Sequence, residues 1–121
     1  DAFVINFALD FEITVFKNYN NTEILLNCTT ELQNYFNIDK WQINQPLIKS
    51  EIENLISSVA GVQSVEKIIF TNKSGISLGY SQYKYDFEGA TKGGITYPAL
   101  DPSIFEIKNL NTDIKGRVTT Y

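Results

Sequence analysis

The chain has 121 residues, of which 43% are hydrophobic and 13% aromatic, a composition typical of one folded domain rather than of a disordered segment. Its formal net charge is −4 at pH 7, and its ten lysine and arginine residues are scattered, which argues against nucleic acid as a partner. It contains no histidine, and its one cysteine excludes both an internal disulfide and a cysteine-based zinc site. No apolar stretch approaches the ~20 residues needed to cross a bilayer, so we expect no membrane partner.

The domain organisation is expected to be simple. The length allows one domain, which we place over residues 1–121. The chain begins at Asp1 and contains no methionine, so we expect it to be an excised domain, or a proteolytic product, of a longer protein.

The first segments alternate hydrophobic and polar residues at the period of a half-buried strand. The alternation is present in residues 11–17 (FEITVFK) and also in residues 3–7 (FVINF). We predict a strand over residues 11–17, with residues 1–9 forming either a preceding strand or an entering arm.

From Asn21 the hydrophobic period becomes that of a helix. Asn21 or Thr22 can cap the helix by accepting a backbone N–H bond, and Glu23 in the first turn suits the positive end of the helix dipole. The predicted apolar face consists of Leu25, Cys28, Leu32, Tyr35 and Phe36.

The connector that follows contains the only tryptophan, Trp41, and then Pro46. We predict Pro46 as the first residue of a second helix, preceded by Asn44 or Gln45 as its cap, because a missing N–H has no cost there. Gly61 stands where a left-handed C-terminal cap is expected. A large indole between two helices predicts that Trp41 fills the inter-helix corner, with a binding hot spot as the alternative. The apolar stripe of this second helix consists of Leu47, Ile48, Ile52, Leu55, Ile56 and Val59.

Residues 62–71 (VQSVEKIIFT) are rich in β-branched side chains and predict the next strand, and residues 72–75 (NKSG) predict a turn. Glycine and proline interrupt the pattern from there to residue 103. Within that segment, residues 81–89 (SQYKYDFEG) alternate rings with charged side chains, which predicts another strand.

The remaining elements are short. Gly93-Gly94 predicts a hairpin leading into residues 95–97 (ITY), and residues 104–108 (IFEIK) predict the last strand. Residues 110–121 are interpreted as a polar tail. The whole order predicts an α+β fold in which two amphipathic helices pack on a small mixed sheet, with long loops in the C-terminal half.

The carboxylates are the candidates for catalysis or metal binding. Asp86 and Glu88 would share one face of a strand, but a dedicated metal site needs more ligands at a recognisable spacing. No nucleophile elbow, dinucleotide fingerprint or P-loop pattern occurs. We therefore expect no catalytic residues, no metal and no cofactor, and keep as a rival a hydrolase that pairs Asp86 or Glu88 with Asp101. The full set of candidates is Asp39, Asp86, Glu88, Asp101, Glu106 and Asp113.

Aromatic residues gather in the glycine-rich segment. Tyrosine is favoured at protein–protein contacts, and long ordered loops in a compact domain usually have a function. We predict an interface there, while the alternative is that the same rings fill the second layer of a small core. The interface candidates are Tyr80, Tyr83, Tyr85, Tyr97 and Phe105.

Several segments together carry a resemblance to a known family. They resemble the C-terminal region of the baseplate wedge proteins of T-even-like contractile-tailed phages, which are related to the wider baseplate J-like family. The resemblance runs from about Asp10 to Arg117, and its specificity lies in the composite of DKWQINQP, GVQSV and YPALDPSIFE. Residues 108–111 (KNLN) depart from the tyrosine-proline-aspartate run expected there. In chain order the segments are FEITVFKNYN, YFNIDKWQINQPLIKSEIENLI, GVQSVEKI, NKSG, YSQYKYDFEGAT, YPALDPSIFEIK and DIKGR.

The resemblance implies a structural, non-enzymatic subunit of the virion tail baseplate, assembled in the host cytoplasm. It also implies that the chain is an excised C-terminal fragment of a longer structural protein. In such phages the wedge protein forms dimers that join neighbouring wedges into a ring around the central hub, and its C-terminal region makes these self-contacts. The implied partners are therefore the chain itself and other baseplate wedge subunits. The rival function is a secreted or virion-surface recognition module that binds carbohydrate or a receptor through the same tyrosines.

Overall fold

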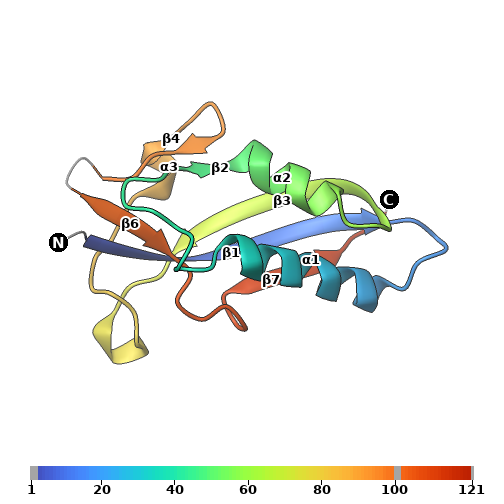
Figure 1. The fold of residues 1–121 in the computed structure, drawn as a ribbon, viewed down its shortest axis with the longest axis horizontal. Helices are drawn as coiled ribbons and strands as arrows, with labels where there is room; N and C mark the ends of the chain where they lie inside the picture. The colour runs from blue at the N-terminus through green and yellow to red at the C-terminus, as the bar shows by residue number, and fades with distance from the viewer. Residues whose placement is uncertain (1–2, 100–101, 121) are drawn as a thin grey trace.

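The computed structural model describes residues 3–99 and 102–120, and it confirms the α+β fold (Figure 1). One long strand, β1 (Phe3–Val15), runs through the whole sheet. Its first four residues pair in parallel with β6 (Ser103–Glu106). From Phe7 onward it pairs antiparallel with β3 (Val62–Asn72), and its second half also pairs in parallel with β7 (Ile114–Val118). The two alternating segments near the N-terminus are therefore parts of one strand.

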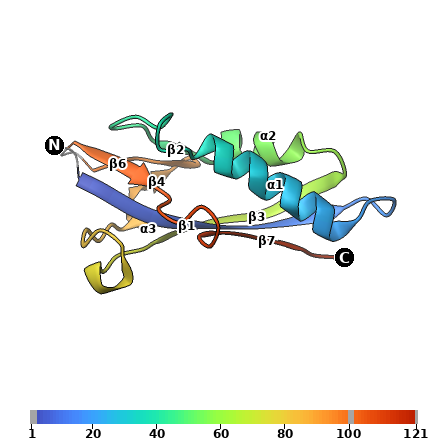
Figure 2. The same ribbon diagram turned by 60° about the horizontal axis from the view of Figure 1, so that its bottom comes forward.

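Two helices, α1 (Asn21–Tyr35) and α2 (Lys49–Ser57), cover one face of this sheet (Figure 2). The cap of α1 is Asn20, one residue earlier than expected: its Oδ1 accepts a hydrogen bond from the Glu23 N–H at 3.0 Å. Neither α1 nor α2 covers the other face of β1, β3 and β7.

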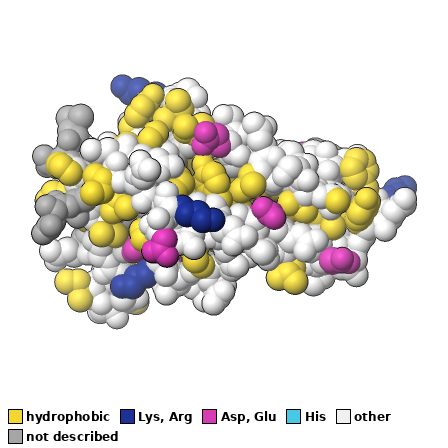
Figure 3. Space-filling view, viewed as in Figure 1, with side chains coloured by type: hydrophobic (Ala, Val, Ile, Leu, Met, Phe, Trp, Pro, Cys, Tyr) yellow, Lys and Arg dark blue, Asp and Glu magenta, His cyan; other side chains and the backbone are white. Residues whose placement is uncertain are grey.

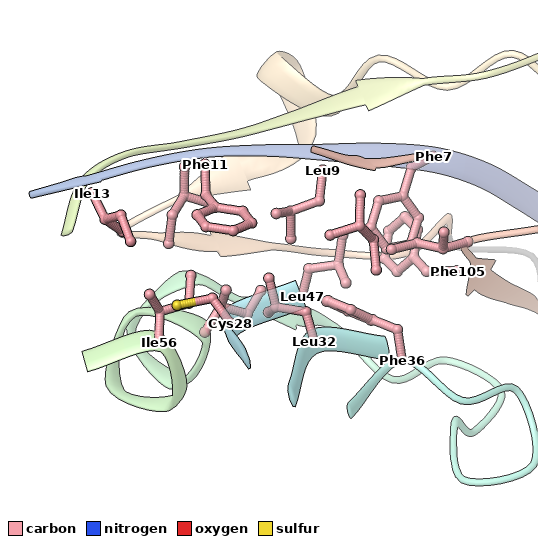
Figure 4. Close-up of a cluster of buried hydrophobic side chains, with 14 of the residues drawn as sticks. Phe7, Leu9, Phe11, Ile13, Cys28, Leu32, Phe36, Leu47, Ile56 and Phe105 are labelled. Carbon is pink, nitrogen blue, oxygen red and sulfur yellow. The ribbon is translucent and has the colours of Figure 1, made fainter. Parts of the chain in front are cut away.

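The core lies between β1 and the two helices. Alternate residues of β1 point to the same side of a strand, and the five odd-numbered residues from Ile5 to Ile13 are at most 3% exposed. Figure 4 shows four of them, Phe7, Leu9, Phe11 and Ile13, directed toward Cys28, Leu32 and Ile56 on the helices. This layer is the apolar contact that the two amphipathic patterns predicted.

Pro46 does not begin the second helix. The residues after it form a short strand, β2 (Leu47–Ile48), and α2 begins at Lys49 with no side-chain cap. β2 pairs with β5 (Ile95–Thr96), which belongs to a hairpin far along the chain. That long-range pairing takes the backbone out of the helix, so the prediction of Pro46 as the first helical residue was wrong.

The predicted caps of α2 also have other positions. Asn44 has a positive φ of 65°, and its Oδ1 accepts a hydrogen bond from the Ser103 N–H at 3.2 Å, so it supports the start of β6 instead of a helix. Gly61 has a φ of 99° but lies four residues beyond the last residue of α2, Ser57, in the turn before β3.

The prediction of a strand over residues 81–89 is wrong. Residues 81–86 lie in loop conformation, and Phe87–Ala90 form a short helix, α3, capped by Asp86, whose Oδ1 accepts a hydrogen bond from the Gly89 N–H at 3.0 Å. The hairpin prediction agrees with the structure. β4 (Thr91–Lys92) turns through Gly93 and Gly94, both at positive φ, into β5.

The prediction of a polar tail over residues 110–121 is wrong, because the described part, residues 110–120, contains a strand of the sheet. β7 lies beside β1, Ile114 is buried, and the polar Lys115 and Arg117 occupy alternate positions. Gly116 lies against the ring of Phe11, which occupies the space where a side chain would start. A short strand with glycine at its centre carries a weak hydrophobic alternation, and this is why the pattern suggested a tail.

Candidate interaction surface

Two of the tyrosines predicted at an interface use their hydroxyls inside the molecule. The Tyr80 hydroxyl donates to the carboxylate of Asp113, at 3.0 Å from Oδ1 and 2.8 Å from Oδ2, and this bond raises the pKa of Tyr80. The Tyr85 hydroxyl donates to the carbonyl of Tyr97 at 2.5 Å, and burial raises the pKa of Tyr85. These hydroxyls hold loops in place.

The rings of the same segment mostly pack on the core. Tyr83 stacks on Phe3 at a centroid distance of 5.2 Å, and Tyr85 meets Phe105 edge-on at 5.9 Å. Phe105 is only 1% exposed, so the prediction of Phe105 as an interface residue is wrong. Tyr97 is 47% exposed and stays a candidate.

Trp41 fills the corner at the end of α1. It is 7% exposed and packs on Tyr35 and Phe36 at centroid distances of 5.5 and 5.3 Å. Its Nε1 is buried without a hydrogen-bond partner among the described residues. The Tyr35 hydroxyl donates to Glu51 at 2.8 Å, which links α1 to α2, and burial followed by this bond raises the pKa of Tyr35. Pro46 is half-buried beside this corner and precedes β2.

A loop over residues 73–81 carries the most exposed large hydrophobic side chains of the described chain. Ile76 and Leu78, on the 3-10 turn η1 (Ile76–Leu78), are each 71% exposed. The turn is bounded by Gly75 and Gly79, both at positive φ. Exposed apolar side chains at the tip of an ordered loop are typical of a contact site.

Hydrogen bonds to one buried residue hold the two ends of the 73–81 loop together. The Lys73 N–H donates to the backbone carbonyl of Asn6 at 2.9 Å, and the Ser81 N–H donates to the Asn6 side-chain Oδ1 at 2.7 Å. Within the loop, the Gly75 N–H donates to the Ser81 carbonyl at 3.0 Å. The loop is therefore closed at its base, and its apolar tip has a defined position.

Sequence reasoning missed Ile76 and Leu78. The available signal was the pattern glycine-isoleucine-serine-leucine-glycine, which places two hydrophobic residues inside a turn instead of a strand or helix. The tyrosines that follow are more conspicuous but more enclosed, because their rings face Phe3, Phe87 and Phe105.

The helix-free face of the sheet forms a second surface, here called the open sheet face. Its side chains lie in cross-strand rows: Glu12 of β1 stands between Lys67 and Arg117, and Asp10 between Ile69 and Lys115. A depression of about 330 Å³ lies over these residues.

One ion pair crosses the open sheet face. Arg117 Nη2 donates to Glu12 Oε2 at 2.8 Å. This hydrogen bond, together with the charge of Arg117 and of Lys67, lowers the pKa of Glu12. Glu12 therefore stays ionised into acidic solution.

Among the described residues, no three of the carboxylates proposed for catalysis come together. Asp86 caps α3, Glu88 is exposed on that helix, and they do not share a strand face as predicted. Asp113 accepts the Tyr80 hydroxyl, and Glu106 accepts the Asn6 amide at 2.7 Å. Asp101 lies outside the described residues.

The remaining candidates for chemistry are the metal-ligand side chains and the thiol of Cys28. The described residues contain no group of three or more acidic, cysteine or histidine side chains that could hold a metal ion. Cys28 is a buried residue of α1, and burial raises the pKa of its thiol to about 11. It therefore behaves as a core residue. Over residues 3–99 and 102–120, no helix has both the length and the apolar character needed to span a membrane.

No protein-family model matches this chain, and no curated protein matches it. The family resemblance therefore depends on the segments quoted above, and the functional argument depends on the two surfaces just described.

Proposed function

We propose that this chain is a structural subunit of a phage tail baseplate that makes self-association contacts, joining wedges into a ring around the hub. The observation that carries the proposal is the 73–81 loop. Two apolar side chains at 71% exposure stand on a turn whose base is closed by hydrogen bonds to Asn6. Exposing them to water is unfavourable for a free monomer and becomes favourable when a partner covers them.

The segment resemblance supports the kind of partner. The quoted segments resemble proteins whose C-terminal regions contact copies of themselves, and a loop with a fixed apolar tip suits such a contact. Baseplate subunits in this role act by holding geometry, so no reaction is assigned to the chain.

The rival, recognition of carbohydrate or a receptor by tyrosines, has weaker support. The hydroxyls of Tyr80 and Tyr85 already donate to Asp113 and to the Tyr97 carbonyl. A sugar-binding platform needs an exposed ring face with a polar edge free to hydrogen-bond, and of the five aromatic candidates Tyr97 alone is described as exposed.

Light scattering over a range of concentrations tests the proposal. We expect the chain to be a monomer or weak dimer in dilute solution, with self-association that rises with concentration. Replacing both Ile76 and Leu78 by aspartate should weaken this association at least about tenfold, which corresponds to ~1.4 kcal/mol.

The control is Lys92→Asp, since Lys92 is exposed on the β4–β5 hairpin and lies outside the 73–81 loop. It should leave the association unchanged. A tight, concentration-independent ring formed by this chain alone, or glycan-array binding by a strict monomer, would contradict the proposal.

A further inference from the structure

The charges of the chain are unevenly distributed over its two sides. Four of the ten cationic residues lie around the open sheet face, together with four of the fourteen carboxylates. Six cations and ten carboxylates therefore belong to the rest of an acidic chain. The four cations are Lys67, Lys73, Lys115 and Arg117, and the four carboxylates are Asp10, Glu12, Glu66 and Asp113.

On the open sheet face, the side chain of Arg117 reaches further into solvent than two of the four carboxylates. The Arg117 side chain is 73% exposed, whereas that of its partner Glu12 is 14% exposed. Asp113 is 7% exposed and is bound by Tyr80. Asp10 and Glu66 are exposed, but Asp10 stands directly beside Lys115 in the cross-strand row, and Glu66 accepts a hydrogen bond from the Ser64 hydroxyl at 2.6 Å. Lys67, Lys115 and Arg117 are exposed around Ile69, so an approaching surface meets more exposed cations than exposed carboxylates there.

The helix layer on the other side has the opposite character. Between residues 20 and 58 it carries five carboxylates and two lysines, and one of these, Lys49, lies 4.0 Å from Glu53 on the same helix. A furrow of about 400 Å³ between α1 and α2 is lined by Glu31, Lys40, Tyr35 and Leu55, among others. Figure 3 shows hydrophobic side chains between the two helices, with acidic side chains and a basic one beside them. The carboxylates are Glu23, Glu31, Asp39, Glu51 and Glu53.

These two surfaces complement each other and not themselves. Two open sheet faces brought together would oppose lysines and arginines, and two helix layers would oppose carboxylates, and like charges in contact are unfavourable. The surfaces lie on opposite sides of the sheet, so one molecule can use both at once (Figure 2). The 73–81 loop projects on the open side, where its apolar tip can reach the apolar furrow of a neighbour.

We propose that the open sheet face of one copy binds the α1–α2 layer of a second copy in a head-to-tail contact. The inference rests on the self-association put forward as the function, and it specifies which surfaces meet. A head-to-tail contact repeats from copy to copy and gives a ring or a row, in contrast to a two-fold dimer, which ends at two copies.

Sedimentation of two charge-reversed variants tests the contact. In the sheet-face variant, Lys67→Glu and Lys115→Glu reverse the open sheet face. In the helix-face variant, Glu31→Lys and Glu53→Lys reverse the α1–α2 layer. Each variant alone should self-associate at least about tenfold more weakly than the unmodified chain, and the unmodified chain should associate more weakly as salt is added. Circular dichroism checks that both variants are folded.

The equimolar mixture of the two variants gives the sharper result. Each variant keeps one unmodified surface, so a head-to-tail contact restores association in the mixture. The two reversed surfaces also carry opposite charges, so the restored species contain the two variants in alternation. The matched control is Lys92→Glu on the β4–β5 hairpin, which should associate like the unmodified chain.

The possible failures are distinguishable. A mixture that stays monomeric overturns the head-to-tail contact. Association that survives in both single variants also overturns it, while leaving the self-association of the proposed function intact. An unmodified chain that stays monomeric at every soluble concentration and at low salt overturns both.

Discussion

The helix-backed part of the sheet and the loops of residues 73–99 are stabilised in different ways. In the first part, alternate residues of β1 pack on apolar faces of α1 and α2, and the contact is spread over many side chains. In the second, a few polar groups hold long segments: Asn6 binds both ends of the 73–81 loop, and Asn72 accepts the Tyr85 N–H at 2.9 Å.

This difference has a functional consequence. Distributed apolar packing makes a rigid support that tolerates small changes, because volume and patterning matter more than any one contact. Loops held by single buried polar residues can present exposed side chains such as Ile76 and Leu78 in one position. They also depend on each of those polar residues individually.

The largest expected loss of stability follows substitution of Phe7, where the helix-backed part of the sheet meets the loops of residues 73–99. Its ring lies within 5.5–6.1 Å of the rings of Phe36, Phe70, Phe87 and Phe105. Phe7→Ala should lower the free energy of unfolding by about 3–5 kcal/mol through lost burial and a cavity. Denaturant unfolding followed by circular dichroism measures this, and a loss below ~1 kcal/mol would mean that the two parts do not share one core.

An intermediate loss of stability is expected for substitution of Asn6, which is 1% exposed. Asn6→Leu leaves the Ser81 N–H without its acceptor, at a cost of about 1–3 kcal/mol. Hydrogen exchange should become faster over residues 73–81 while α1 and α2 keep their protection.

The matched control for Asn6 is Thr14→Val on the same strand. Thr14 is also buried, and its partner Ser64 retains a hydrogen bond to Glu66 at 2.6 Å. If Thr14→Val loosened the 73–81 loop as much as Asn6→Leu does, the loop would depend on the sheet in general and not on Asn6.

The smallest effect is expected for Tyr80→Phe, which removes one hydroxyl from Asp113 and should cost about 1 kcal/mol. The pKa of Tyr80 is higher in the folded chain than its ordinary value of ~10. Its contribution to stability is therefore complete below pH ~10 and is lost as the pH rises toward the folded value.

Unfolding measurements at alkaline pH distinguish the contribution of Tyr80 to stability from the contributions of the other tyrosines. Unfolding measured as the pH rises above ~10 should show a smaller loss of stability in Tyr80→Phe than in the unmodified chain. The variant keeps the part that arises from Tyr35 and Tyr85, whose pKa values are also raised. Identical alkaline profiles for the two chains would show that the hydroxyl has no role in stability.

The sequence was informative where periodic apolar residues determine the structure. It predicted the α+β class, both helices, the β3 strand and the Gly93-Gly94 hairpin, because each leaves a local pattern. It could not predict β2 or β7, since both are short strands formed by pairing with residues far away in the chain.

The exposed side chains of the candidate interaction surface were predicted only in part. The segment after residue 73 was correctly singled out as loop-rich, but Phe105, Tyr83 and Tyr85 pack on the core because rings of the first strand and of α3 lie beside them. The exposure of Ile76 and Leu78 depends on Asn6, seventy residues earlier, and no local pattern contains that contact.

The most direct test of self-association through these surfaces is hydrogen exchange read by mass spectrometry at low and at high concentration of the unmodified chain. We expect added protection at high concentration in β7, in the 73–81 loop and along α1 and α2, while the β4–β5 hairpin exchanges at the same rate in both. Protection confined to the hairpin, or no change at concentrations where sedimentation detects association, would contradict the account.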